Sequence, residues 1–160
     1  MLSNAAGVFQ DSIHVLPNQN SHTRGRETDG SAVWSVFTTG TPNATNFSAM
    51  QEYATTPIFS QVGGYNSAAI NITLSSPDPN ITIYYTTNGD EPNNTSTQYT
   101  TAINIANTTV IKAICYSSDP TIPASFIDYH TFFINDTHTI PILSVSGNSG
   151  TGGLLDLLDG

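Results

Sequence analysis

Asparagine is the residue type whose spacing most directly suggests chemistry in this chain. The sequence holds 15 Asn, 17 Ser and 23 Thr in 160 residues. Asn followed two positions later by Ser or Thr is the acceptor motif for N-linked glycans. The abundance of Ser and Thr alone predicts about four such motifs, whereas eight asparagines satisfy it: Asn43, Asn46, Asn71, Asn80, Asn93, Asn94, Asn107 and Asn135.

Two interpretations of these motifs stay open. In the first, several of them carry glycans, foremost the four that fall at expected turns, where a transferase could reach them: Asn80, Asn93, Asn94 and Asn107. In the second, Asn and Thr are simply residues favoured in turns and on strand surfaces. The first interpretation predicts a glycoprotein, and the second an unmodified β protein.

Acidic residues at turns are the next candidates, because carboxylates are ligands for Ca²⁺. Ca²⁺ needs six to eight oxygen ligands, and the spacing of these residues matches no known calcium loop. They are Asp78, Asp90, Glu91, Asp119 and Asp136. We expect solvated carboxylates, with no metal and no cofactor.

The sequence contains no arrangement typical of catalysis. Its histidines, His14, His22, His130 and His138, show no pair at metal-ligand spacing. A Gly-x-Ser-x-Gly nucleophile motif is also absent. We therefore expect a protein that is not an enzyme.

Three further features have a structural interpretation. Asp128 and His130 share one face of an expected strand and Tyr129 takes the other, which predicts a surface face and a core face. Cys115 is the only cysteine, so no internal disulfide forms, and a buried thiol is expected. Trp34 could offer a platform for sugars, but a place in the core is the simpler expectation.

The composition excludes several functions. There are 3 Lys and Arg against 12 Asp and Glu, a net charge of −9, and charged residues make up 9% of the chain against a typical ~25%. Three cations cannot neutralise a run of phosphates, so nucleic acid and anionic membrane surfaces are not expected partners.

No apolar run approaches the ~20 residues that span a bilayer. The first residues lack signal-peptide features, so any export signal is expected outside this chain.

The pattern predicts an all-β protein. Short runs rich in Thr, Ile, Val, Tyr and Phe alternate with turn residues, as in antiparallel sandwiches. Strands are expected at 8–16, 32–38, 68–74, 81–87, 99–105, 108–117, 125–134 and 140–146. In one of them Ile81, Ile83 and Tyr85 face the same way, which predicts one apolar face per sheet.

Four segments follow from these elements. Residues 1–47 hold too few strands to close a core and form a partial β segment. Residues 48–60 form a linker, residues 61–138 a β-sandwich, and residues 139–160 a strand with a Gly- and Ser-rich tail.

The sandwich segment resembles a known family. The run Ile-Tyr-Tyr-Thr-Thr-Asn-Gly-Asp-Glu-Pro at 83–92, then Ser96, Tyr99, Ile103 and Thr-Thr-Val-Ile-Lys-Ala at 108–113, resembles the chitobiase/β-hexosaminidase C-terminal-type module over about residues 56–135. Asn88 stands where that family usually has Asp, and either residue tolerates a left-handed turn. The resemblance implies an immunoglobulin-like sandwich that serves as an accessory module without catalytic residues.

Two weaker resemblances concern the flanks. The segment from Ser21 to Asn46 looks like the closing part of a lamin-tail-type domain, and the tail at 140–159 is similar to the approach to a CotH-like kinase domain. Both kinds of domain accompany the sandwich module in exported microbial proteins. The resemblances imply a piece of a larger extracellular or cell-surface protein.

Two functions are therefore expected. One is a structural or accessory module, assembled into a glycosylated fibre by exchange of a strand at 1–16 or 139–146. Its partners would be copies of itself or adjoining domains of the same protein. The other is a carbohydrate-binding module of a larger secreted enzyme or CotH-like kinase protein. The second predicts aromatic side chains exposed in a row on one sheet, and the first predicts them buried.

Overall fold

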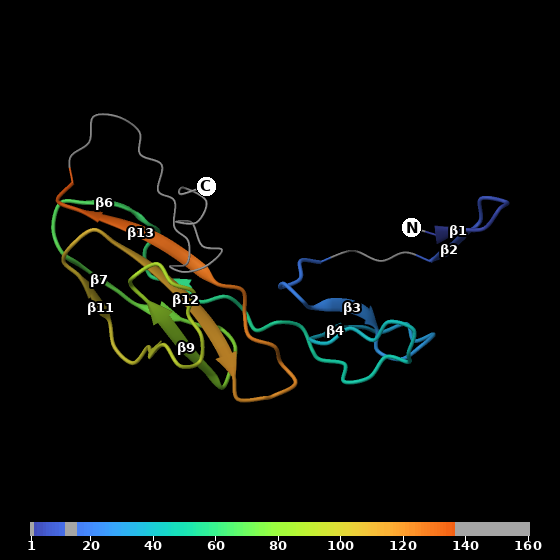
Figure 1. Ribbon diagram of the computed structural model, residues 1–160. Coiled ribbons are helices and arrows are strands. Elements are labelled where there is room, and N and C mark those ends of the chain that lie inside the picture. Colours follow the sequence, from blue (N-terminus) through green and yellow to red (C-terminus); the bar gives the residue numbers. More distant parts are fainter. Residues whose placement is uncertain (1, 12–15, 137–160) are drawn as a thin grey trace, which may run out of the picture. The chain divides into compact units, whose positions relative to one another are not determined.

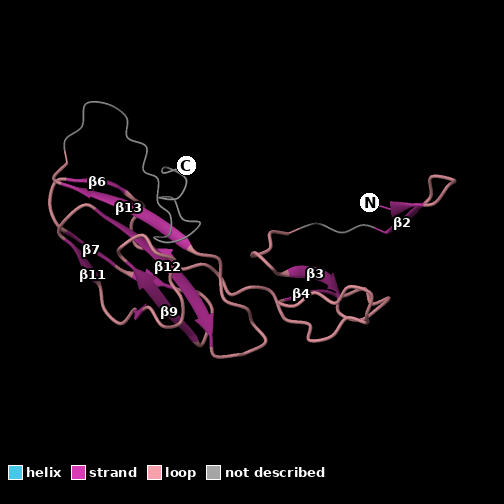
Figure 2. Cartoon of the chain, viewed as in Figure 1, coloured by secondary structure: helices cyan, strands magenta, loops and turns pink. Residues whose placement is uncertain are grey.

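A computed structural model describes residues 2–11 and 16–136 of the chain. It separates into two compact units, Met1–Ala49 (unit 1) and Met50–Gly160 (unit 2). The residues described contain strands, turns and loops and no helix (Figures 1 and 2). The expected all-β class is confirmed, and among the same residues no helix is long and apolar enough to cross a membrane.

Unit 1 contains two separate pairs of antiparallel strands. β1 (Leu2–Ser3) pairs with β2 (Phe9–Asp11), and β3 (Thr23–Arg26) pairs with β4 (Trp34–Phe37). The hairpin of β3 and β4 buries Val36 and Phe37. The ring of Phe37 packs across Gly25, where an added Cβ would lie 3.4 Å from it. Two paired strands therefore bury only a small amount of apolar surface.

The strands of unit 1 differ from the expected ones in two places. The strand expected at 8–16 is limited to β2, with residues 12–15 outside the described part. The segment between the two expected strands contains β3, because Thr23–Arg26 pairs with β4 although it has little apolar alternation. Several apolar side chains of this unit are exposed: Val8, Leu16, Val33 and Phe47.

The larger sheet of unit 2 has five strands. Their order is β10 (Thr97–Gln98), β9 (Ile81–Thr86), β12 (Thr109–Ser117), β13 (Asp128–Ile134) and β6 (Gly64–Asn66). Neighbours are antiparallel, except that β6 runs parallel to β13 at one edge. Figure 1 shows β6 beside β13.

A second layer consists of two strand pairs. β5 (Ile58–Phe59) pairs with β8 (Leu74–Ser75), and β7 (Ile70–Ile72) pairs with β11 (Ile103–Ile105). Only Thr73 separates β7 from β8, and the Ser60 N–H donates to its carbonyl at 2.9 Å. The two pairs are therefore continuous, and this layer packs against the larger sheet as a β-sandwich.

One apolar core lies between the layers, and strand alternation explains it. The predicted inward set on β9 is confirmed: Ile83 is buried, and Ile81 and Tyr85 pack against the same cluster. Strand β12 contributes Ile111, Ala113 and Cys115, and β13 contributes Phe132 and Ile134. The second layer adds Ile72, Leu74, Ile103 and Ile105. Every second residue faces the opposite sheet, as a period of two requires.

The chain changes layers between β5 and β6. An added Cβ at Gly63 would lie 2.6 Å from the Thr131 carbonyl oxygen and 3.0 Å from the Thr131 nitrogen. The crossing therefore needs a glycine, because backbone passes closely against backbone. Gly64 follows with φ +147, and β6 then enters the larger sheet parallel to β13.

Two expectations about unit 2 differ from the structure. Residues 50–60 of the expected linker are bound to the sandwich, since the Gln51 and Ala54 N–H groups donate to the Thr121 and Pro123 carbonyls and Ala54 is buried. Strands β5, β6 and β10 were not expected, because all three are very short. In the turn after β9, Gly89 takes the left-handed conformation (φ 89). The strand expected at 140–146 lies outside the described residues.

Candidate functional site

A groove opens at the edge of the larger sheet where β6 and β13 end. Its lining consists of Tyr65, Asn66, Ser67, Asn135 and Asp136, and its volume is about 570 Å³. We call it the β6–β13 groove. Segments about 70 positions apart in the sequence meet here because of the parallel pairing, in which Tyr65 lies opposite Phe133 and Asn66 opposite Ile134.

An exposed aromatic ring forms one wall of the groove. The rings of Tyr65 and Phe133 are stacked, with their centroids 5.0 Å apart and an interplanar angle of 23°. Phe133 is half-buried, while 53% of Tyr65 is exposed. The stacking orders the Tyr65 ring and leaves an aromatic surface beside the groove.

Hydrogen bonds fix the polar groups around this ring. The Asn66 amide accepts from Gln61 Nε2 at 2.9 Å and donates to the Gly64 carbonyl at 3.2 Å. Asp136 Oδ2 accepts from the Thr108 hydroxyl at 2.7 Å, and that hydroxyl in turn accepts from the Ile134 N–H at 3.1 Å. The groove is thus largely formed before any ligand binds.

Asn135 turns the chain out of β13 at the mouth of the groove. Its φ of 55 is left-handed, a conformation that Asn adopts more readily than most residues. Its N–H donates to the Asn66 carbonyl at 2.9 Å, which closes the end of the β6–β13 pair. The side-chain amide is exposed and has no hydrogen-bond partner among the residues that the structure describes.

In the middle of the larger sheet, the side chains on the outer face are buried rather than exposed to solvent. Ile114 is 7% exposed and Lys112 is 6% exposed, although both belong to the outward set of β12. Tyr84 lies opposite Ile114 and packs edge to face on Tyr116, with the ring centroids 5.7 Å apart. Large exposed aromatics on this sheet therefore occur at the β13 and β6 edge, as Tyr65 and Tyr129.

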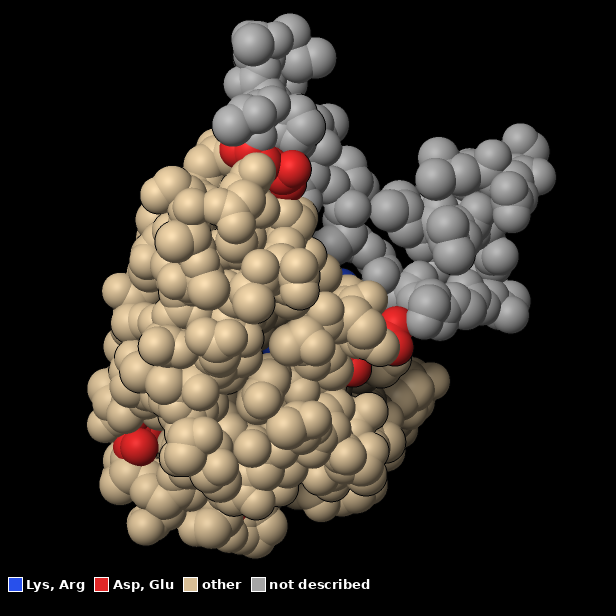
Figure 3. All heavy atoms as spheres, turned by 90° about the vertical axis from the view of Figure 1, so that its left-hand side faces the viewer, with Lys and Arg blue, Asp and Glu red and all other residues tan. Residues whose placement is uncertain are grey.

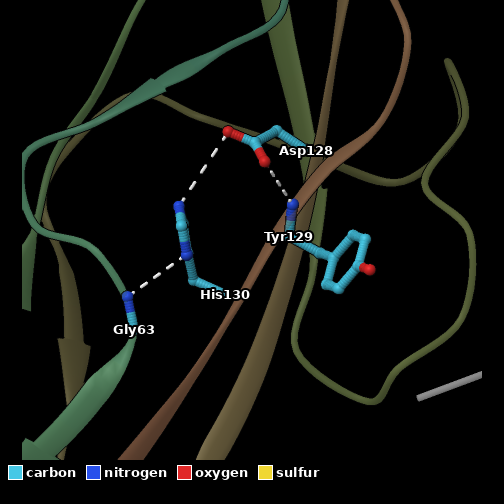
Figure 4. A network of polar contacts seen from close by, with 4 residues as sticks. All are labelled: Gly63, Asp128, Tyr129 and His130. Atoms are coloured by element: carbon cyan, nitrogen blue, oxygen red, sulfur yellow. Dashed lines mark hydrogen bonds and ion pairs between the residues drawn. The ribbon is translucent and has the colours of Figure 1, made fainter. Parts of the chain in front are cut away.

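Asp128 and His130 share a face, as expected, but the exposed member of this trio is Tyr129, at 60%. The His130 Nδ1 accepts from the Gly63 N–H at 3.2 Å, and Nε2 lies 3.9 Å from an Asp128 carboxylate oxygen (Figure 4). In that figure the Tyr129 side chain points the other way. Since Nδ1 accepts, Nε2 carries the proton of the neutral ring. His130 thus holds the layer crossing in place.

Four of the five acidic residues singled out at turns accept hydrogen bonds from other residues: Asp78, Asp90, Asp119 and Asp136. Asp78 accepts from the Thr55 N–H and hydroxyl, and Asp90 accepts from Asn88 Nδ2 at 2.7 Å. Bonds from the Thr121 hydroxyl and N–H lower the pKa of Asp119. On the face shown in Figure 3 the acidic side chains are scattered. Within the described ranges no three His, Cys, Asp or Glu side chains gather as metal ligands would.

The structure distinguishes one sequon asparagine from the rest. Asn46 is half-buried, and its Nδ2, the atom that would carry a glycan, donates to the Arg26 carbonyl at 2.7 Å. The other seven are exposed: Asn43, Asn71, Asn80, Asn93, Asn94, Asn107 and Asn135. At Asn93 the side-chain oxygen accepts from the Thr95 N–H and hydroxyl, so this motif forms an Asx turn. Of the exposed seven, Asn135 lines the groove.

Cys115 is a core residue, as predicted. It is 0% exposed, its N–H donates to the buried Ser125 hydroxyl at 2.8 Å, and burial raises the pKa of its thiol to about 11.

Trp34, expected in the core, lies at the surface with 36% exposed, and the Arg26 guanidinium carbon lies 5.3 Å from its ring centroid. Trp34 is in unit 1, whereas the groove is in unit 2.

Sequence reasoning missed the groove residues Tyr65, Asn66 and Ser67. No strand was expected at 64–66, since three residues are too few to show alternation. The Gly63-Gly64 pair before an aromatic and two polar residues was the available signal, because adjacent glycines often mark a close backbone approach.

Comparison with known protein families gives a match over part of the sandwich, less than half of the chain. No curated protein and no solved structure matches the chain significantly. The lamin-tail and CotH-like resemblances of the flanks therefore stay predictions. Residues 61–127, which include Tyr65, Asn66 and Ser67 but end before β13, match the family of the chitobiase/beta-hexosaminidase C-terminal domain.

Proposed function

We propose that unit 2 is a non-catalytic accessory module of an extracellular protein, and that it binds carbohydrate through the β6–β13 groove. The exposed ring of Tyr65, ordered by Phe133 and flanked by amide and carboxylate side chains, carries the proposal. A sugar ring has an apolar face of C–H groups, which packs on an aromatic ring, and hydroxyls at its edge. Sites that combine an aromatic wall with a few fixed polar groups suit such a ligand.

The family match supports a role beside carbohydrate chemistry, because the family is named after enzymes that act on carbohydrates. The accessory role is supported by the side chains of the groove, whose only ionisable groups among the described residues are the Tyr65 phenol and the Asp136 carboxylate. Glycan-bearing sequons and an extracellular location belong to the same proposal.

The negative charge of the groove and of the whole chain favours a neutral carbohydrate as the ligand. The described residues that line the groove supply one carboxylate and no cation, and the chain has a net charge of −9. An anionic polymer such as pectate would therefore be repelled.

The test is adsorption of the unglycosylated full chain to insoluble chitin and cellulose, measured by depletion from solution. Tyr65→Ala should weaken adsorption at least about tenfold, equivalent to about 1.4 kcal/mol. Tyr129→Ala is the matched control, because it removes an equally exposed tyrosine outside the groove, and it should change adsorption less than twofold. Equal losses in both variants, or no adsorption by the wild-type chain, would contradict the proposal.

A specific observation favours a second function, self-assembly through unit 1. Among the described residues its strand pairs have edges without a neighbouring strand, and Val8, Val33 and Phe47 are each more than half exposed. Exposed edges and apolar side chains favour pairing with another chain. Light scattering and electron microscopy should then show oligomers or filaments that Val33→Glu weakens. A monodisperse monomer at high concentration would exclude this function.

A further inference from the structure

Asn135 differs from the other seven sequon asparagines in what surrounds it. It lines the β6–β13 groove, and the residue two positions before it is aromatic, Phe133. At the other sequons this position holds Thr, Ala, Asp, Glu, Pro or Ile. Because Phe133 stacks on Tyr65, a sugar joined to Asn135 would begin its path next to an exposed aromatic surface.

The side-chain amide of Asn135 is also accessible for attachment of a glycan. It is exposed and unpaired among the described residues, whereas the Nδ2 of Asn46 is occupied by the Arg26 carbonyl. The left-handed backbone and the bond from Asn135 N–H to the Asn66 carbonyl fix where the side chain starts. A glycan here would therefore start from a fixed point of the backbone at the edge of the groove.

We propose that Asn135 carries an N-linked glycan whose first sugar packs on Tyr65 inside the β6–β13 groove. The apolar face of that sugar covers the Tyr65 ring, and its polar groups meet Asn66 and Ser67. In chains that carry this glycan, the groove is filled and an external polysaccharide is excluded, so the proposed carbohydrate binding belongs to chains in which Asn135 is unmodified. The exclusion rests on the proposed function, whereas the packing of the glycan does not.

The attachment is a transfer from a lipid-linked oligosaccharide pyrophosphate. The Asn135 Nδ2 attacks C1 of the first sugar, the bond from C1 to the pyrophosphate oxygen breaks, and Nδ2 loses one proton. The lipid pyrophosphate leaves with the bonding electrons. The host's oligosaccharyl transferase catalyses this step, and no redox change occurs.

The experiment compares the full chain made in yeast, with its glycans trimmed to a single N-acetylglucosamine, with two variants. Thr137→Ala abolishes the Asn135 sequon and changes none of the described side chains that line the groove. Thr73→Ala abolishes the Asn71 sequon on the other layer and is the matched control. Glycopeptide mass spectrometry gives the occupancy of each site, and thermal denaturation gives Tm.

We expect Asn135 to be occupied, and Thr137→Ala to lower Tm by roughly 3 °C, a shift that is measurable in a domain of this size. Thr73→Ala should lower Tm by less than about 1 °C through loss of its glycan. In a Tyr65→Ala background, Thr137→Ala should no longer lower Tm. An unoccupied Asn135, or a Tm effect that is the same with and without Tyr65, would overturn the proposal.

Polysaccharide adsorption separates this inference from the proposed function. If both hold, the trimmed wild-type glycoprotein should adsorb at least about tenfold less than glycosylated Thr137→Ala. If the unglycosylated chain adsorbs nothing while the Tm coupling to Tyr65 persists, the proposed function fails and the glycan packing stands. Equal adsorption of both glycoproteins would contradict the exclusion.

Discussion

Units 1 and 2 have a similar composition but bury very different amounts of apolar surface. Both are rich in Thr, Ser and Asn, and both contain antiparallel strand pairs. In unit 1 the described strands have two to four residues, and the buried large side chains are Val36 and Phe37. Unit 2 has strands of six to nine residues, β9, β12 and β13, whose inward residues meet a second layer.

This difference shows that strand propensity alone does not make a fold. A two-stranded hairpin has no opposite layer on which to bury its apolar face, so it is marginal in water. Unit 2 satisfies this requirement within itself, and we expect unit 1 to depend on a partner. The proposed binding groove accordingly lies in unit 2, where the sandwich orders Tyr65 and its neighbours.

The largest loss of stability is expected for Phe132→Ala, which leaves a cavity in the core of unit 2. Phe132 is 0% exposed, and such truncations cost about 3–5 kcal/mol. Circular dichroism should show the loss in a urea titration. The fluorescence of Trp34, the only tryptophan and a residue of unit 1, should keep its own transition. A parallel shift of both signals would show that the units unfold together.

Gly63→Ala tests the layer crossing that builds the groove. The new Cβ would lie 2.6 Å from the Thr131 carbonyl oxygen, so β6 must move away from β13, and we expect a loss of about 2–3 kcal/mol. Gly40→Ala in unit 1 is the control, because its nearest contact would be an ordinary 3.8 Å. That variant should stay within about 0.5 kcal/mol of wild type. Similar denaturation midpoints for both variants would contradict the close approach.

Cys115 gives a pH test of burial in unit 2. Its thiol pKa is raised to about 11 in the folded chain, so the folded state holds a proton that the unfolded state releases from about pH 9. Stability is therefore fully present below pH 9 and falls as the pH rises toward 11, by roughly 1–2 kcal/mol at pH 10.5. Denaturation at pH 8 and 10.5 should show this slope in wild type and not in Cys115→Ala. An identical slope in both would refute it.

The smallest effect concerns Asp119, an exposed turn residue of unit 2. Hydrogen bonds from Thr121 lower its carboxyl pKa, so its contribution to stability is present at neutral pH and is lost as the pH falls below about 4. Asp119→Asn should lose less Tm than wild type between pH 7 and pH 3. An equal loss would show that this turn does not couple protonation to folding.

The sequence predicted much of unit 2, because its long strands show the period of two directly. Ile81, Ile83 and Tyr85 face the core as expected, and Cys115 is buried as expected. The groove could not be predicted in the same way. It depends on parallel pairing of a three-residue strand with β13, and neither that pairing nor the Gly63 crossing leaves a periodic pattern.

In unit 1 the expected position of an aromatic side chain was wrong. Trp34 was expected in the core because a large aromatic in a short strand usually is, but the hairpin has no layer to cover it, and the ring is partly exposed beside Arg26. The interpretation of residues 1–47 as a partial β segment stays a prediction.

A titration of the isotope-labelled, unglycosylated full chain with soluble chito- and cello-oligosaccharides, followed by NMR, shows whether the β6–β13 groove binds neutral carbohydrate. We expect amide shifts to change at Tyr65, Asn66, Ser67, Asn135 and Asp136 and Tyr65→Ala to abolish the changes. Changes confined to the β5, β7, β8 and β11 layer or to unit 1, or no changes with either sugar series, would contradict this expectation.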